Sequence, residues 1–246
     1  MYNLLNSKYV DYQYSDWLAY LKQNDTCRLQ SDFSEEPILN LSARKLIFPS
    51  ITAFQRGEHS DGIHLSIEAQ KFAAQYQEPD YPEVMQYFIR EENFHSSYLA
   101  RYMHFHHEPL SQEIPLDRIF RKIRKSMGIF SEISVLITAE IIALTYYTAL
   151  GNVGRELKSP ALSAICEQML HDELRHIILQ SYTLGHLCTG REVTVFRHLL
   201  MEKTTAAVWL AYGNLIREGG FSYGAFRDEN LGYLEQSLSI AQKRSI

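Results

Sequence analysis

The chain has 246 residues, 46% of them hydrophobic and 22% charged, with a formal net charge of −5, which fits a folded globular protein and gives no reason to expect nucleic acid as a partner. Its three cysteines, Cys27, Cys166 and Cys188, are odd in number and scattered, which excludes a disulfide scaffold and a cysteine-rich zinc site. The start of the chain lacks the layout of a signal peptide, and no uncharged apolar run approaches a membrane span, so we expect a cytoplasmic location and no membrane contact.

Residues 1–49 are expected to form an arm that packs on the main body. An amphipathic helix is predicted from about Val10 to Lys22, because Trp17 and Leu21 recur on one side. Residues 32–37 are acidic and turn-like. Neither part shows a pattern that indicates chemistry, so we expect the arm to contribute packing only.

A long helical pattern follows Pro49, with apolar side chains three or four positions apart as far as Tyr76. Glu58 interrupts this apolar stripe. The run ends at residues 78–82, where Asp80 can cap the next helix. We therefore expect one helix from about Ser50 that carries a single acid on its core face.

The second predicted helix, from about Tyr81 to His106, carries Glu92 and His95 within its apolar stripe. Residues three apart lie on one face of a helix, so a Glu-x-x-His unit directs a carboxylate and an imidazole at the same point. The mixed basic segment 117–125 that follows is expected to be a short crossover helix. Its charges indicate a solvated face rather than an anion site.

The third predicted helix, about Phe130 to Leu150, is apolar nearly all round and should be central in a bundle. One acid, Glu140, lies in its middle. An ionised carboxylate in such surroundings costs several kcal/mol unless a positive group faces it. Residues 151–160 are expected to break the helix, because they include glycines and end in a proline.

The fourth predicted helix, about Ala161 to Leu187, carries a second Glu-x-x-His unit, Glu173 and His176. Two further helices, about 192–217 and 226–243, are expected to pack on a four-helix core. No β-strand period is convincing in the sequence. The fold class is therefore predicted as an all-α four-helix bundle with additional N- and C-terminal helices, in a single domain whose core spans about residues 50–188.

The charges repeat along the chain. Glu58 precedes Glu92 by 34 residues and Glu140 precedes Glu173 by 33, as expected of two helical hairpins related by an approximate two-fold axis. A four-helix bundle that binds two metal ions takes Glu-x-x-His from two helices and one Glu from each of the others. Glu68, beside Lys71, stays open as an alternative to Glu58 on the first helix.

The predicted ligands are four carboxylates and two imidazoles. They are Glu58, Glu92, His95, Glu140, Glu173 and His176. Because thiolates are missing, this set suits iron or manganese, and we expect two Fe ions, with Mn/Fe or Mn/Mn as alternatives. Glu91 and Asp172 are either surface acids or acceptors for the far ring nitrogens of the ligand histidines.

The two segments Glu91-Glu92-Asn93-Phe94-His95 and Asp172-Glu173-Leu174-Arg175-His176 resemble the ferritin-like di-iron carboxylate proteins. Within that superfamily the chain is most similar to acyl-carrier-protein desaturases and arylamine N-oxygenases, over about residues 50–188. It also resembles uncharacterised bacterial ferritin-like proteins with a Gly-Glu-x-Ser-x-Gly segment, here residues 57–62. That similarity favours Glu58 over Glu68 as the first ligand.

The resemblance implies a ferritin-like fold and an oxidoreductase that activates O2 for hydroxylation, desaturation or N-oxidation. It departs from the N-oxygenases at Met169, where they carry an extra histidine, and from the desaturases at Ala143 and Leu144, where they carry a threonine. The expected partners are a small-molecule or carrier-bound substrate, O2 and an external electron donor, with a homodimer as a further expectation.

Two other functions stay open. The first is iron oxidation and storage, or manganese-dependent peroxide disproportionation, and the second is a metal-free helical scaffold that binds a partner. Tyr98, Tyr146 and Tyr147 lie near the predicted ligands in sequence. They are expected to pack in the core rather than to tune electron flow.

Overall fold

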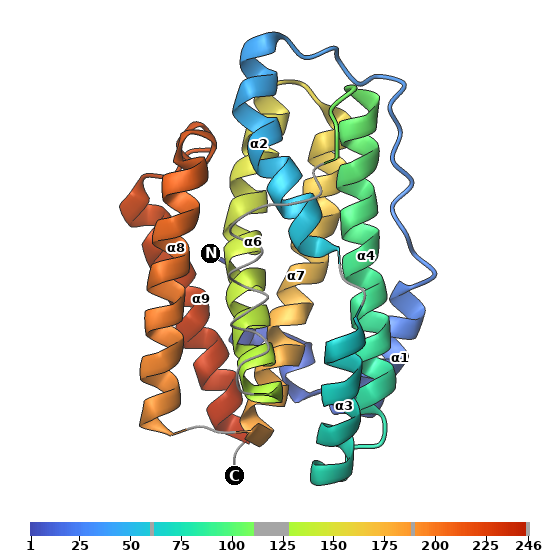
Figure 1. The fold of residues 1–246 in the computed structure, drawn as a ribbon, viewed down its shortest axis with the longest axis vertical. Helices are drawn as coiled ribbons and strands as arrows, with labels where there is room; N and C mark the ends of the chain where they lie inside the picture. The colour runs from blue at the N-terminus through green and yellow to red at the C-terminus, as the bar shows by residue number, and fades with distance from the viewer. Residues whose placement is uncertain (60–61, 111–127, 188–189, 245–246) are drawn as a thin grey trace.

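The computed structural model describes residues 1–59, 62–110, 128–187 and 190–244, and all regular structure within them is helical (Figure 1). The helices are α1 (Tyr14–Asn24), α2 (Leu41–Glu58), α3 (Ile63–Tyr76), α4 (Tyr81–Phe105), α6 (Ile129–Glu156), α7 (Pro160–Leu187), α8 (Arg191–Glu218) and α9 (Tyr223–Arg244). Two short 3₁₀ turns, Leu4–Asn6 and Lys8–Asp11, precede α1. The all-α prediction is confirmed, and the crossover helix expected at 117–125 lies outside the described residues.

The long helices pack side by side, and their buried apolar side chains form two clusters. Helices α2 and α3 follow each other along α4, while α6 packs along α7, and α4 meets α7 across the centre (Figure 1). Helices α8 and α9 cover the far side of α6 and α7, and α1 packs against α4. The arrangement therefore brings α2, α4, α6 and α7 to face one another.

The single helix expected from Ser50 to Tyr76 is wrong, because α2 ends at Glu58 and α3 begins only at Ile63. Between them, Gly62 has a φ of +67°, a left-handed conformation that favours glycine. A Cβ at Gly62 would lie 2.8 Å from the side chain of Ile89 on α4. The chain therefore turns directly after Glu58, at a point where the backbone passes close to α4.

The start of α2 also differs from the expectation. The helix begins at Leu41, because the side chain of Asn40 accepts a hydrogen bond of 2.9 Å from the amide of Ala43. Pro49, expected to precede the helix, lies inside it. A proline in a helix interior removes one backbone hydrogen bond, so its place in α2 depends on packing rather than on propensity.

Helix α6 continues past its predicted end at Leu150. A Cβ on Gly151 would lie 3.2 Å from the Cβ of Cys166 on α7, so the glycine allows the two helices to approach closely. Among the described helices, α6 alone is long and apolar enough to cross a membrane, but it is mostly buried inside the bundle. Burial in the core accounts for its apolar character.

The acidic turn at residues 32–37 has a structural role that the sequence did not indicate. Glu36 is buried and accepts hydrogen bonds from the Ser159 hydroxyl and, at 3.0 Å, from the Ala161 amide at the start of α7. Burial raises the pKa of Glu36, but these bonds and the nearby His106 lower it more, so the net pKa lies below its ordinary value. The N-terminal arm is thereby fixed to α7.

Candidate metal centre

The structure brings all six predicted ligands together in the middle of the bundle. They form two overlapping groups, Glu58, Glu92, His95 and Glu173 in one, and Glu92, Glu140, Glu173 and His176 in the other. In each group, one nitrogen or oxygen from every residue lies within 4.8 Å of the others, and all six side chains are buried. These groups of carboxylate and imidazole atoms could hold a metal ion.

Two of the residues belong to both groups. Glu92 comes from α4 and Glu173 from α7, and these helices meet at the centre of the bundle. Glu58 and His95 complete one group, while Glu140 and His176 complete the other. A carboxylate has two oxygens, so each shared glutamate can contribute an oxygen to each group.

Each helix presents its ligands for a local reason. Glu58 is the last residue of α2, and Glu140 lies on the inward face of α6. The pairs on α4 and α7 are each three residues apart, which places carboxylate and ring on one face of the helix. The two groups therefore have the same composition, each with three glutamates and one histidine.

Both histidine rings turn Nδ1 towards the carboxylates. Nδ1 of His176 lies 3.2 Å from Oε1 of Glu92 and 3.3 Å from Oε2 of Glu173. Nδ1 of His95 lies 3.6 Å from Oε1 of Glu92 and 3.5 Å from Oε1 of Glu173. When Nε2 carries the ring proton, Nδ1 of each ring offers a lone pair to the centre.

The outer ring nitrogens contact carboxylates on the opposite helix. Nε2 of His95 on α4 lies 3.0 Å from Oδ2 of Asp172 on α7. Nε2 of His176 on α7 lies 3.1 Å from Oε2 of Glu91 on α4. Glu91 and Asp172 are each 1% exposed, so they are not surface acids. Because a carboxylate can accept the proton of Nε2 in each ring, the lone pair of Nδ1 would be available to a metal ion.

Burial and mutual contact shift the pKa of acids and imidazole rings in the cluster. Burial raises the pKa of Glu58 and of Glu173, and neighbouring carboxylates raise both further. Burial lowers the pKa of His176, but hydrogen bonds to Glu140, Glu173 and Glu91 outweigh it and raise the pKa well above its ordinary value. The pKa of Glu140, by contrast, is lowered on balance, because hydrogen bonds to Glu173 and His176 outweigh the effect of burial.

A test of fit is given by polar atoms that are buried without a partner. Oε1 of Glu92, Nδ1 of His95 and Oε1 of Glu173 have no well-aligned hydrogen-bond partner in the part of the chain that the structure describes, although Nδ1 of His176 lies 3.2 Å from Oε1 of Glu92. Such atoms cost about 1–3 kcal/mol each when left unpaired. All three belong to the groups described above and face the shared centre, so the residues present fit a metal site.

The two first-helix candidates differ in their surroundings. Glu58 belongs to a group, and its Oε1 accepts a hydrogen bond of 2.7 Å from the Tyr147 hydroxyl. Glu68 is also buried, but it belongs to neither group, and its Oε1 lies 2.6 Å from Nζ of the exposed Lys71. The geometry therefore places Glu58, and not Glu68, beside the other acids.

The three tyrosines noted in the sequence have different contacts. Tyr147 reaches the centre through Glu58, whereas Tyr146 donates to the Ser50 hydroxyl at 2.9 Å. The hydroxyl of Tyr98 accepts the amide of Leu29 at 3.2 Å. All three tyrosines pack in the core as expected. Among the three, Tyr147 also donates a hydrogen bond to a candidate ligand, and the ring of Tyr98 lies 6.4 Å from that of His95 between centroids.

Sequence reasoning also missed the N-terminal arm. Asn24 and Arg28 both reach the outer carboxylate of Glu91. No periodicity or motif marks these two residues, because their contact with α4 joins positions more than sixty apart in the chain.

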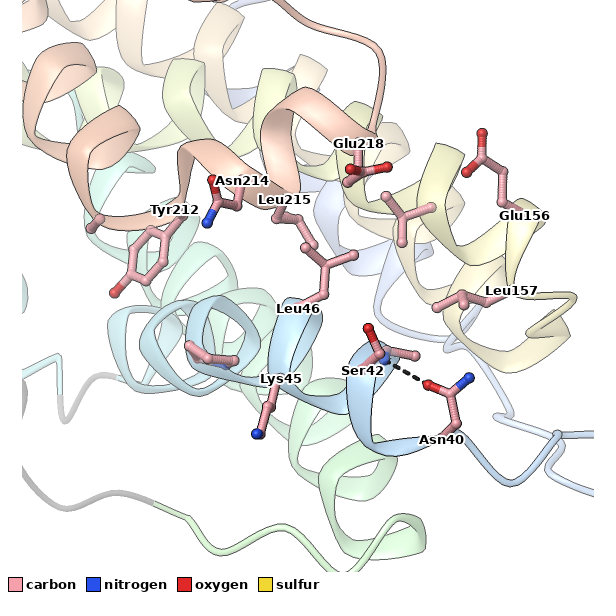
Figure 2. Close-up of a pocket in the computed structure, with 14 residues that line it drawn as sticks. Asn40, Ser42, Lys45, Leu46, Glu156, Leu157, Tyr212, Asn214, Leu215 and Glu218 are labelled. Atoms are coloured by element: carbon pink, nitrogen blue, oxygen red, sulfur yellow. Dashed lines mark hydrogen bonds between the residues drawn. The ribbon is translucent and has the colours of Figure 1, made fainter.

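A surface pocket of about 670 Å³ lies between α2, the end of α6 and α8 (Figure 2). Its lining includes Lys45 of α2, Glu156 of α6, and Tyr212 and Glu218 of α8. None of the six candidate ligands lines it. The pocket is therefore separate from the centre.

Comparisons of the chain with protein-family models, with curated proteins and with solved structures find no match. The class of protein therefore has to be argued from the geometry of the centre.

Proposed function

We propose that the chain is a ferritin-like di-metal carboxylate protein that binds two iron ions and activates O2 as an oxidase or oxygenase. The observation that carries the proposal is the sharing of Glu92 and Glu173 between two buried groups. Two shared carboxylates, with one further acid and one imidazole on each side, are the ligand set of di-metal helical bundles.

The donor atoms favour iron or manganese over other metals. Both groups consist of carboxylate oxygen and imidazole nitrogen, whereas zinc in closed structural sites and copper in electron-transfer sites commonly take thiolates. Each group offers four residues, which leaves positions for O2 or a substrate when the ion prefers six ligands. Manganese in one or both positions would use the same ligands.

The protein's own residues would orient the metal ligands and exclude water from the centre. Asp172 and Glu91 hold the histidine rings, and the Tyr147 hydroxyl orients Glu58. The ring of Phe88 packs edge-on against His176, with centroids 4.8 Å apart, and shields that side. Bound iron would supply one-electron redox chemistry towards O2, with electrons from an external donor.

Small molecules would approach from the side of α2 and α4. Glu58 and Glu92 are 8% and 9% exposed, whereas the other four candidate ligands are at most 3% exposed. This small exposure supports a small organic or carrier-bound substrate rather than direct contact with the folded surface of a protein substrate.

The test is an anaerobic titration with Fe²⁺ followed by exposure to O2, with O2 uptake and the optical spectrum recorded. We expect uptake in proportion to bound iron and a transient absorption band that decays faster with a substrate than without one. Glu68→Gln serves as a matched control and should behave as the unaltered protein does. A large shell in a sizing experiment, with iron retained as a mineral, would instead indicate an iron-storage function and contradict the oxygenase proposal.

A further inference from the structure

The end of helix α1 contacts the two outer carboxylates from behind. The side-chain amide of Asn24, the last residue of α1, donates to Oε1 of Glu91 and lies 3.3 Å from Oδ1 of Asp172. Nη1 of Arg28 lies 3.2 Å from the same Oε1 of Glu91. One amide therefore bridges both acids, and one guanidinium adds a positive charge.

Arg28 is itself held in place. It forms an ion pair with Asp25, and its guanidinium carbon lies 4.2 Å from the ring centroid of Phe94. Phe94 is one of the two residues between Glu92 and His95 in the first Glu-x-x-His unit. Only 12% of the Arg28 side chain is exposed, so solvent screens its interaction with Glu91 weakly.

The charge of the centre gives Arg28 a specific role. The four candidate carboxylate ligands and the two outer acids carry six negative charges, of which two divalent ions would neutralise four. Among the described residues, no other lysine or arginine forms an ion pair with Glu91 or Asp172. Arg28 is therefore the cation that offsets part of the remainder.

We propose that Asn24 and Arg28 are positioning residues of the metal centre, acting on both histidine rings through Glu91 and Asp172. Metal affinity then depends on the docking of the N-terminal helix, since α1 supplies a contact to both outer acids. This inference rests on the proposed function, because it assumes that ions occupy the two groups. It assigns chemistry to an arm whose sequence indicates packing only.

The test compares Asn24→Ala and Arg28→Met with a control that changes the same surface. Arg90→Met is the control, because Arg90 is 57% exposed and pairs with Asp25 at 3.1 Å, without an ion pair to Glu91 or Asp172. The dissociation constant for Mn²⁺ is measured by equilibrium dialysis on each full-length protein. Loss of an outer contact should weaken Mn²⁺ binding about tenfold, whereas the control should match the unaltered protein.

A second readout separates positioning from mere stability. The reduction potential of bound iron should fall in Arg28→Met, because removal of a positive charge favours the oxidised ions, and it should recover in Arg28→Lys. A general loss of stability would not recover with charge in this way. Circular dichroism shows whether each variant folds, and Arg28→Gln replaces the methionine variant if that one does not.

The outcomes are distinct. Unchanged Mn²⁺ affinity and unchanged potential in Asn24→Ala and Arg28→Met, in a protein that binds two ions, would overturn this inference alone. If the unaltered protein takes up no Mn²⁺ or Fe²⁺, the proposed function fails, and this inference fails with it. Equal losses in the Arg90→Met control would also overturn it, because they would show a general effect of charge on that surface.

Discussion

The substitution Glu58→Gln should have opposite effects on the metal-free and the metal-loaded protein. Glutamine keeps the size of the side chain and an oxygen that can accept from Tyr147, but it removes the charge. Glu68→Gln is the matched control, because Glu68 is also buried but belongs to neither metal-binding group.

The metal-free protein should become more stable in Glu58→Gln. Burial and the carboxylates of Glu92 and Glu140 raise the pKa of Glu58, so its ionised form opposes folding near neutral pH. Each pKa unit of such a shift corresponds to about 1.4 kcal/mol. Within the described residues, the control removes an ion pair with the exposed Lys71, which is worth about 0–1 kcal/mol.

The metal-loaded protein should lose stability in Glu58→Gln. Removal of an outer partner of a ligand weakens metal binding by about 10–100-fold, so we expect about 100-fold for a ligand itself. At a free ion concentration of about 100 times the dissociation constant, the bound ion stabilises the protein by about 2.7 kcal/mol. With affinity about 100-fold lower, the same concentration contributes only about 0.4 kcal/mol.

The assay is urea unfolding in excess chelator and again at fixed free Mn²⁺. Glu58→Gln should unfold at higher urea than the unaltered protein in chelator, and should gain much less from Mn²⁺. Glu68→Gln should gain as much from Mn²⁺ as the unaltered protein does. The reasoning is refuted if Glu68→Gln loses the response to Mn²⁺ and Glu58→Gln keeps it.

Three further outcomes are expected. Tyr147→Phe leaves Oε1 of Glu58 without its donor and should weaken Mn²⁺ binding by about tenfold in equilibrium dialysis; unchanged affinity would show that this hydrogen bond does not orient the ligand. Gly62→Ala, at a φ of +67°, should lower the free energy of unfolding by at least about 1 kcal/mol in urea, and an unaltered midpoint would contradict the strain. Glu36→Gln should destabilise the protein by about 1–2 kcal/mol at pH 7, because the Ala161 amide loses a charged acceptor. The pKa of Glu36 is lowered on folding, so its contribution to stability is present above pH 4.5 and is lost as the pH falls through the folded pKa. The difference in stability between variant and parent should therefore shrink at low pH.

The sequence predicted the helices that carry the centre because their periodicity is strong. Glu92 and His95 on α4, and Glu173 and His176 on α7, lie on core faces that the apolar spacing defines. Glu140 was informative because an acid in an apolar helix needs a compensating partner. The spacing of charges along the chain predicted which side chains meet, except that it left both Glu58 and Glu68 open on the first helix.

The break after Glu58 could not be predicted from the same spacing. The apolar stripe continues through Gly62 and Leu65 at helical intervals, so the pattern gives no sign of an interruption. At Gly62 the backbone has a φ of +67° and passes close to the Ile89 side chain, and the apolar spacing carries no information on either feature. The continuation of α6 past Gly151 was missed for a similar reason, because that glycine packs against Cys166.

The contacts of the N-terminal arm were also beyond sequence reasoning. Asn24, Arg28 and Glu36 are ordinary polar residues in or beside a short helix and a turn, where solvent exposure is the usual outcome. Their buried contacts join α1 and the following loop to α4 and α7 across long stretches of chain. Only the three-dimensional packing assigns them a role.

The most direct measurement of the central claim is the number of transition-metal ions bound per chain, determined by elemental analysis after anaerobic loading with Fe²⁺ and removal of excess metal. Two shared glutamates between two buried groups predict two ions per chain, and Glu173→Ala should lose both because Glu173 belongs to each group. Fewer than one ion per chain in the unaltered protein, or two ions retained by Glu173→Ala, would contradict the account.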